Sequence, residues 1–368
     1  MANRRVTKDE SDAQIASAVL ASFPLNKLDR ILEAHVSDHD KVVVKGSNLI
    51  PLRIGNNWFL IDTDTNVSTA ADLDAGVISN GKDYYVYACD SAGTLVFKIS
   101  LASTFPAGFD ATNSRKIGGF HTLCVAVGVI AGHTLTGYVA NDILPASIWD
   151  LKHRPMSAPE GMAFIPDLNL WVDIYLMSGT GVNTKSVYNA AITDTRDWMN
   201  FVEDAFLVRK KLLDDDEFQA AAYGSNEETN ISGDADPVTT GGHSDTAARR
   251  MISNYGLEDC CGALWQWLRT QSYRFDGAAS HTHQVTVSGD PQTVTSGVPS
   301  GDVAPAWAYY DLGSKGSLYR QGTYGDVKLL AGGVWNSGSD CGSQFRHAAS
   351  SRWFAPLWLG GRAASQAL

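Results

Sequence analysis

The N-terminal residues carry apolar positions at helical spacing. Ile15, Val19 and Phe23 precede Pro24, and further apolar residues resume the stripe after the proline. A spacing of three to four residues places side chains on one face of a helix, and a proline interrupts that helix. The pattern therefore predicts a short helical N-terminal segment within residues 1–40.

The pattern changes to short apolar runs over residues 41–150. Runs such as Lys41–Lys45, Trp58–Ile61 and Thr94–Ile99 are separated by turns that contain glycine or asparagine. β-branched and aromatic residues between such turns are typical of strands. We therefore expect a β-rich domain of sandwich or small-barrel type over residues 41–150.

A third pattern begins after a proline-rich break. Residues 162–176 predict two strands joined by a Pro-Asp turn, and Thr195–Lys211 has the spacing of an amphipathic helix. The polar segment Gly224–Thr246 predicts a surface loop, and residues 276–326 are again loop-like. We expect one α+β domain over residues 156–368, with a twisted antiparallel sheet, two helices and long loops.

The composition argues against several classes of partner. The 368 residues carry a formal net charge of −11 and no long basic stripe. Nucleic acid is not expected as a partner, because phosphate neutralisation supplies most of that affinity. The chain has no apolar run of about 18 residues that would predict membrane insertion. Its N-terminus lacks the apolar region of a secretory signal, so we expect synthesis in a cytoplasm without a signal peptide.

The most informative segment lies near the C-terminus, over about residues 332–362. Its glycines mark tight turns or close backbone approach. Between them stand large side chains of unrelated chemistry, such as Phe345, His347 and Trp358. A glycine-pinned scaffold that displays mixed aromatic and polar residues suits a binding surface. On these residues alone, an irregular C-terminus of core and loop explains the pattern equally well.

The order Gly-Gly-x-Trp-Asn, Cys-Gly-Ser, Arg-Trp and Gly-Gly-Arg in this segment resembles the variable region of diversity-generating retroelement variable proteins. Upstream blocks such as Leu170–Leu176 and Gly262–Leu268 resemble the C-type lectin fold of the formylglycine-generating-enzyme type, which carries such regions. The resemblance covers roughly residues 156–368. It implies a tropism-determinant-like receptor-binding protein of α+β fold, not an enzyme, with no cofactor.

The family divides its variable region into fixed and diversified positions. The resemblance assigns the scaffold to Gly332, Gly333, Trp335, Arg346, Arg352, Trp353, Gly360, Gly361 and Arg362. It assigns the diversified, ligand-contacting positions to Ser337, Ser339, Asp340, Gln344, Phe345, His347, Ser350, Ser351, Phe354, Pro356, Leu357 and Trp358. Because substitution of packed residues costs about 2–5 kcal/mol, diversified side chains are expected on one exposed patch. Arg352, Trp353, Gly360 and Arg362 are expected to point into the scaffold.

The resemblance also implies partners and a location. It implies a host-cell surface receptor, either a protein or a glycan, as the ligand. It implies other virion tail proteins, contacted through the N-terminal domain, with residues 41–150 as an attachment or spacer domain, and it implies a homotrimeric assembly. The corresponding location is the tip of a virion tail fibre.

An enzyme related to the formylglycine-generating enzymes is one alternative. Those enzymes use a pair of cysteines late in the domain, whereas here Cys260 and Cys261 are vicinal and Cys341 lies far along the chain. The chain has five cysteines, and an odd, sparse count argues against a disulfide framework. A contact or disulfide between Cys341 and one of the vicinal pair stays open.

A metal-dependent enzyme of the same fold is the other alternative. His281 and His283 would lie on one face of a strand, with His243 or Asp290 as a further ligand. The setting is a polar loop, which favours solvated histidines. The acidic run Asp214–Glu217 lacks the spacing of a calcium loop and is better explained as a charged helix end.

Overall fold

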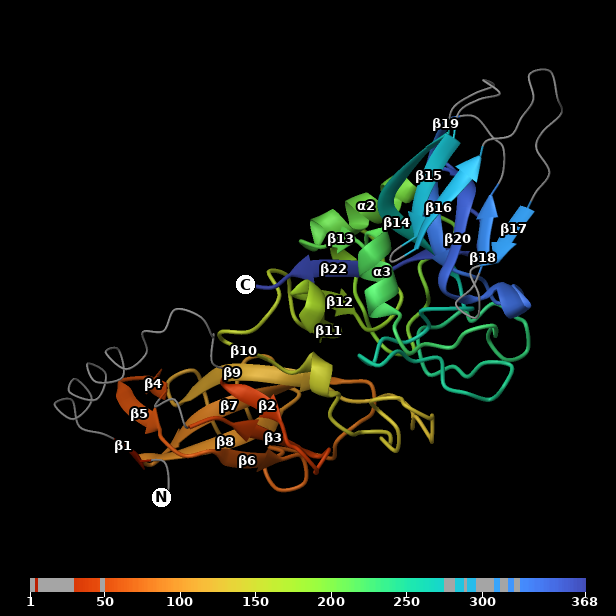
Figure 1. The fold of residues 1–368 in the computed structure, drawn as a ribbon. Coiled ribbons are helices and arrows are strands. Elements are labelled where there is room, and N and C mark those ends of the chain that lie inside the picture. Colours follow the sequence, from red (N-terminus) through yellow and green to blue (C-terminus); the bar gives the residue numbers. More distant parts are fainter. Residues whose placement is uncertain are drawn as a thin grey trace, which may run out of the picture. The chain divides into compact units, whose positions relative to one another are not determined.

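The computed structural model describes most of the chain. The described residues are 4–5, 30–46, 50–274, 282–287, 290–295, 308–311, 317–320 and 325–368. They divide into two compact units (Figure 1), of which the first comprises Met1–Ala126, Tyr138–Pro155 and Ala367–Leu368, and the second Val127–Gly137 and Met156–Gln366. No helix among the described residues is both long enough and apolar enough to cross a membrane.

The first unit consists of antiparallel sheets. One sheet has the order β1 (Arg4–Arg5), β5 (Asn57–Ile61) and β4 (Ile50–Ile54). A second has the order β2 (Leu32–Ala34), β3 (Lys41–Val44) and β6 (Thr65–Ser68). The third has the order β10 (Trp149–Asp150), β9 (Ser114–His121), β7 (Asp83–Ser91) and β8 (Thr94–Ser100), and the 3₁₀ turn η1 (Pro145–Ser147) precedes β10.

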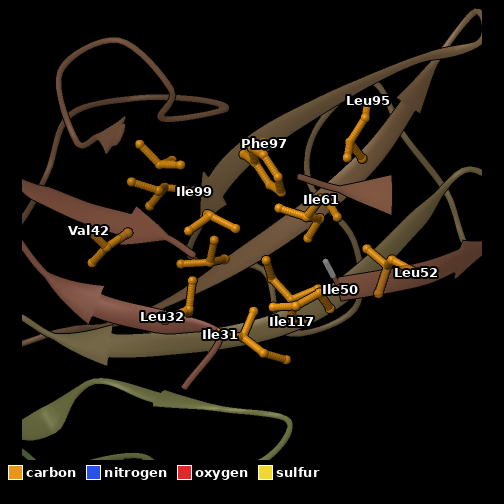
Figure 2. Close-up of a cluster of buried hydrophobic side chains, with 14 of the residues drawn as sticks. Ile31, Leu32, Val42, Ile50, Leu52, Ile61, Leu95, Phe97, Ile99 and Ile117 are labelled. Atoms are coloured by element: carbon orange, nitrogen blue, oxygen red, sulfur yellow. The ribbon is translucent and has the colours of Figure 1, made fainter. Parts of the chain in front are cut away.

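The core of this unit follows from strand alternation. In β4, Ile50, Leu52 and Ile54 are buried, whereas Pro51 and Arg53 are exposed, which is the period of two that a half-buried strand requires. Figure 2 shows side chains from all three sheets pointing toward one another, among them Ile61 of β5, Val42 of β3 and Phe97 of β8. The β-rich character expected for this region is confirmed.

The helix expected within residues 1–40 is not found in the described part of that segment. Leu32, a member of the predicted helical stripe, lies in β2 and pairs with Val44 of β3. The backbone amides of Ile31 and Leu32 donate to Asp150 Oδ2 at 2.7 and 3.1 Å. Pairing with a distant strand thus outweighs local apolar spacing at this end of the stripe. The rest of the stripe, residues 6–29, lies outside the described residues.

The second unit contains two larger sheets and a hairpin. The four-stranded sheet is antiparallel, in the order β11 (Met162–Ile165), β12 (Leu170–Asp173), β22 (Ala363–Gln366) and β13 (Lys211–Leu212). The six-stranded sheet has the order β17 (Ala308–Asp311), β18 (Ser317–Arg320), β20 (Gly342–Ser351), β19 (Gly325–Gly332), β14 (Trp265–Arg274) and β21 (Leu359–Gly361). The hairpin pairs β15 (Thr282–Val287) with β16 (Asp290–Thr295).

Helices α2 (Trp198–Leu207) and α3 (Asp215–Ala221) belong to this unit, with 3₁₀ turns at η2 (Pro166–Leu168), η3 (Gly181–Asn183) and η4 (Gly338–Asp340). The carboxylate of Asp197 caps α2 by accepting from Asn200 N at 2.9 Å. Buried Phe201 and Ala205 form the apolar face of α2 that the sequence spacing predicts. The two strands joined by a Pro-Asp turn and the helix within residues 195–211 are confirmed.

Two expectations for the second unit are wrong. The six-stranded sheet is mixed rather than antiparallel, because β18 runs parallel to β20 and β14 runs parallel to β21. The region 276–326, expected to be loop, contains strands β15 to β18. Its abundant Gly, Ser and Pro residues favour loops, but the threonine and valine residues of Thr282–Val287 are β-branched and also suit a strand. Hydrogen bonding to a partner strand decides between the two.

The polar segment Gly224–Thr246 is less exposed than expected. It contains no helix or strand, yet Asn226, Asn230 and Asp245 are buried. The side chain of Asn230 makes several of the hydrogen bonds in this segment. Its Oδ1 accepts from Gly338 N at 3.1 Å. Its Nδ2 donates to Ile231 O, to Asp234 Oδ1 and to Trp335 O. Side-chain amides thus provide the hydrogen bonds that a regular element would otherwise supply.

Arg362 joins the two larger sheets of the second unit. It stands between β21 and β22, and its side chain is 1% exposed. Its Nη1 donates to the carbonyls of Asp173 and Ile174, both at 2.7 Å. Its Nε donates to Gln266 Oε1 at 3.0 Å, and its Nη2 donates to Glu258 O. One guanidinium therefore ties together the end of β12, the segment before β14, and β14 itself.

We predict that Arg362→Met destabilises the second unit by about 3–5 kcal/mol, because the substitution leaves buried carbonyl groups without a hydrogen-bond donor. Urea unfolding followed by tryptophan fluorescence measures the loss. Arg209→Met is the matched control, because Arg209 is exposed in the same unit, and it should change the free energy of unfolding by less than about 0.5 kcal/mol. Equal effects of the two substitutions would contradict the role given to Arg362.

Candidate functional site

The segment singled out in the sequence forms one side of the second unit. Its strand β20 lies between β18 and β19, with His347 opposite Leu330 of β19. A loop of residues 352–358 follows, and β21 then pairs in parallel with β14. The segment thus alternates between sheet-embedded strands and connections at their ends.

The glycines before β20 are required by the backbone. Gly332 and Gly333 have φ angles of +92° and +91°, a region that side-chain-bearing residues rarely adopt. A Cβ on Gly332 would lie 2.4 Å from Cys260 O, and one on Gly333 would lie 2.9 Å from Cys341 Sγ. These residues permit the close packing that their scaffold assignment implies.

Arg346 fixes β20 to helix α3. Its side chain is fully buried, its Nε pairs with Asp215 Oδ1, and its Nη1 donates to the carbonyls of Ser343 and Phe345 at 2.8 and 3.1 Å. Its guanidinium also lies 5.1 Å from the centre of the Phe218 ring. A buried cation with this many partners holds the strand in place.

The loop of residues 352–358 has an anchored backbone. Arg352 O accepts from Trp198 N of α2 at 3.1 Å. Trp358 O accepts from Trp265 N of β14 at 3.2 Å, and Leu359 N donates to Pro356 O at 3.2 Å. Because these bonds use main-chain atoms, the two ends of the loop are held whichever side chains it carries.

Apolar side chains of this loop are exposed. Trp353 is 67% exposed, Phe354 42% and Leu357 48%. Phe354 stands edge-on to Trp358 with ring centres 5.2 Å apart, and Trp358 contacts the His347 ring at 6.4 Å. An exposed aromatic group on an anchored backbone is the form that binding hot spots take.

A hollow of about 410 Å³ opens beside these rings. Its lining combines aromatic, aliphatic and polar side chains, contributed by Trp265, Val334, Trp335, Asn336, Ser337, Asp340, His347 and Trp358. His347 also lies 5.5 Å from Trp265, ring centre to ring centre. Burial lowers the pKa of His347 to about 4, so its imidazole is neutral near pH 7.

The structure divides the positions assigned to ligand contact into three groups. Exposed are Ser339, Phe354 and Leu357, and partly exposed are Ser337, Asp340, His347, Pro356 and Trp358. Buried are Gln344, Phe345 and Ser350. The side chain of Ser351 lies outside the described residues.

The expectation of a single exposed patch is therefore wrong for Gln344, Phe345 and Ser350. Phe345 is 1% exposed and packs against Trp265 with ring centres 4.5 Å apart. The reason is that both faces of β20 are covered where it begins, because the successive residues Gln344, Phe345 and Arg346, whose side chains alternate between the faces, are all buried.

The expectation for Trp353 is wrong in the opposite sense. This residue was placed in the scaffold, but its side chain points to solvent, with Arg352 stacked 5.3 Å from its ring centre. Trp335, Arg352 and the remaining scaffold residues are at least partly buried, and Gly360, Gly361 and Arg362 are fully so. Sequence reasoning had not placed Trp265 or Asn336 at the ligand-contacting positions, although both line the hollow.

The cysteines show no sign of redox chemistry. Cys260, Cys261 and Cys341 are free thiols in the protein interior. Burial raises the pKa of Cys341 to about 12 and raises the pKa of the vicinal pair, so the reactive thiolate form is disfavoured in all three.

The candidate metal ligands are placed only in part. His281 and the side chains of His283 and Asp290 lie outside the described residues. His243 Nδ1 lies 2.9 Å from Asp259 Oδ2, and the described residues contain no cluster of three or more ligand-type side chains. Asp214 and Glu217 form a capping box at the start of α3.

Known proteins resemble this chain over nearly its whole length. Residues 35–150 match the family described as Mtd second domain. The tail fibre receptor-binding protein of Bordetella phage BPP-1 is 29% identical over 400 residues, a match that covers 98% of this chain and 90% of that protein. The solved structures of the major tropism determinant U1 and M1 variants align over 95% of this chain and 87% of theirs, with 26% identity and a TM-score of 0.66. The chain is similar to the major tropism determinants over nearly its whole length.

This relationship confirms the resemblance to tropism-determinant-like variable proteins found in the sequence. The similarity also extends beyond residues 156–368, because the matched family domain covers residues 35–150, most of which belong to the first unit. The β-rich fold with few helices is shared with the solved tropism determinants.

Two phenylalanines of the segment should respond in opposite ways to the same substitution. We predict that Phe345→Ser destabilises the second unit by about 3–5 kcal/mol, because a buried ring is lost. Phe354→Ser should shift the free energy of unfolding by less than about 1 kcal/mol, because the ring is exposed. Thermal and urea unfolding of the two variants measure the difference, and comparable destabilisation would show that Phe354 is a packing residue.

Proposed function

We propose that this chain is the receptor-binding, tropism-determining protein of a phage tail fibre. It acts as a binding protein and not as an enzyme, like the tail fibre receptor-binding protein that it resembles over 98% of its length. The observation that carries the proposal is the loop of residues 352–358. Its main chain is tied at both ends, while Trp353, Phe354 and Leu357 extend into solvent.

The second unit supplies the ligand-binding domain in this proposal. We assign it a C-type lectin fold, a choice supported by its sequence blocks and its paired sheets with two helices. The host receptor contacts the diversified positions that have solvent access, which are Ser337, Ser339, Asp340, His347, Phe354, Pro356, Leu357 and Trp358. The buried positions Gln344, Phe345 and Ser350 would then shape the site from behind.

The first unit provides attachment to the virion in this proposal. Support comes from its match to a domain family of the tropism determinants over residues 35–150. The protein would then sit at the tail fibre tip, with other tail proteins bound through this unit and the host receptor bound through the second. Division of labour between the two units is consistent with their separate cores.

Attachment should depend on the exposed loop. We predict that the double substitution Phe354→Ser and Leu357→Ser lowers binding of the labelled full chain to host cells at least about tenfold, because two exposed anchors are removed. The melting temperature should stay within about 2 °C of the unmodified chain. Flow cytometry and calorimetry measure the two effects.

Phe206→Ser is the matched control for this experiment. Phe206 is 75% exposed on α2 of the same unit but lies outside the proposed site. Its substitution should leave cell binding unchanged. Full binding by the loop variant, or an equal loss in the control, would remove the basis for placing receptor contact in this loop.

We further propose that the chain is a homotrimer, so that weak single-site binding becomes strong through multivalency. Multi-angle light scattering of the purified chain at micromolar concentration should give about three times the chain mass of 39.6 kDa. A stable species near the mass of one chain would refute this assembly while leaving the binding surface intact.

A further inference from the structure

The hollow beside β20 has a distinctive chemical character. Its described lining contains three indole rings, from Trp265, Trp335 and Trp358, together with the imidazole of His347. Asp340 supplies the carboxylate, and none of these lining residues is a lysine or an arginine. The hollow therefore combines aromatic walls with a negative charge.

A second carboxylate is held near the same turn. The buried Asn230 donates from its Nδ2 to Asp234 Oδ1 at 2.6 Å and also to the carbonyl of Trp335. Its Oδ1 accepts from Gly338 N at 3.1 Å, in the 3₁₀ turn that ends at Asp340. A single side chain thus links Asp234 to the backbone of Trp335 and to the turn that ends at Asp340.

Two positive groups of this part of the unit, Arg346 and Lys328, have partners elsewhere. Arg346 pairs with Asp215 beneath β20, and the Lys328 ammonium lies 4.3 Å from the centre of the Trp198 ring. The imidazole of His347 is neutral near pH 7 because burial lowers its pKa to about 4. Nothing in the described lining would balance the charge of an anionic ligand, such as a phosphate or an acidic sugar.

We propose that this hollow receives a cationic side chain, lysine or arginine, from a protein receptor. Aromatic faces attract cations through their negative ring quadrupoles, and a carboxylate adds a charge-assisted hydrogen bond. The aliphatic stem of a lysine or arginine would pack against the indoles while its charged head reaches Asp340. The inference rests on the proposed function, because it names the chemistry by which that receptor is recognised.

Small probes test the hollow directly on the full chain. Saturation-transfer NMR would compare N-acetyl-lysine methylamide and N-acetyl-arginine methylamide with the neutral N-acetyl-norleucine methylamide. We expect a cationic probe to bind at least about fivefold more tightly than norleucine. Asp340→Asn should remove most of that preference, while Asp216→Asn, at an exposed acidic residue on α3, should leave it unchanged.

Several results would overturn the inference. Equal binding of norleucine, or an unchanged preference in Asp340→Asn, would show that charge does not select the occupant. Preferential binding of methyl glucoside or methyl galactoside, used as further probes, would assign the hollow to a neutral sugar instead. Absence of binding by every probe would also reject it.

The two experiments distinguish a failure of this inference from a failure of the proposed function. If no probe binds but the Phe354 and Leu357 double variant still loses cell attachment, receptor binding stands and only the cationic occupant is wrong. If cell attachment survives the loss of those two side chains, the receptor-binding surface itself has been misplaced, whatever the probes show.

Discussion

The second unit depends on the burial of Arg362 at the joint between its two larger sheets. A buried guanidinium costs a large desolvation free energy, and only several acceptors in the right positions offset it. Here the carbonyls of Asp173, Ile174 and Glu258 and the amide of Gln266 fill that role. Gln266 in turn donates to the carbonyls of Asp259 and Cys260. These buried polar contacts therefore hold the irregular backbone of residues 258–260 in place, where strand pairing does not supply the hydrogen bonds.

This rigid joint permits a surface that tolerates change. Strand β20 is held by the ion pair between its Arg346 and Asp215 of α3. The loop of residues 352–358 is held through main-chain atoms of Arg352 and Trp358. The exposed side chains of that loop, Trp353, Phe354 and Leu357, are not needed for these main-chain bonds. Substitutions there would then alter recognition without a large cost in stability, whereas substitutions of buried side chains on β20 would create cavities. The separation of these two roles is the physical condition for a diversified binding site.

The aromatic side chains at this surface range from buried to exposed. Phe345 and Trp265 are buried against each other, His347 and Trp358 are partly exposed, and Phe354 is exposed. Successive ring contacts therefore connect the core to the surface. A ligand that touches the exposed rings would meet side chains whose positions are already restricted by packing, which lowers the entropy cost of binding.

The sequence by itself determined the class of protein, strands such as β3, the helix α2 and the glycine positions before β20. These follow from local rules, because strands, helical spacing and left-handed backbone each need particular residues at particular positions. Burial within the variable segment was decided by the tertiary structure. Phe345 and Phe354 are the same residue type nine positions apart, yet the first is buried because it packs against Trp265 in the core, while the second is exposed on an anchored loop. The exposure of Trp353 and the position of Trp265 in the lining of the hollow have the same cause, because neighbours distant in sequence set the environment of each side chain.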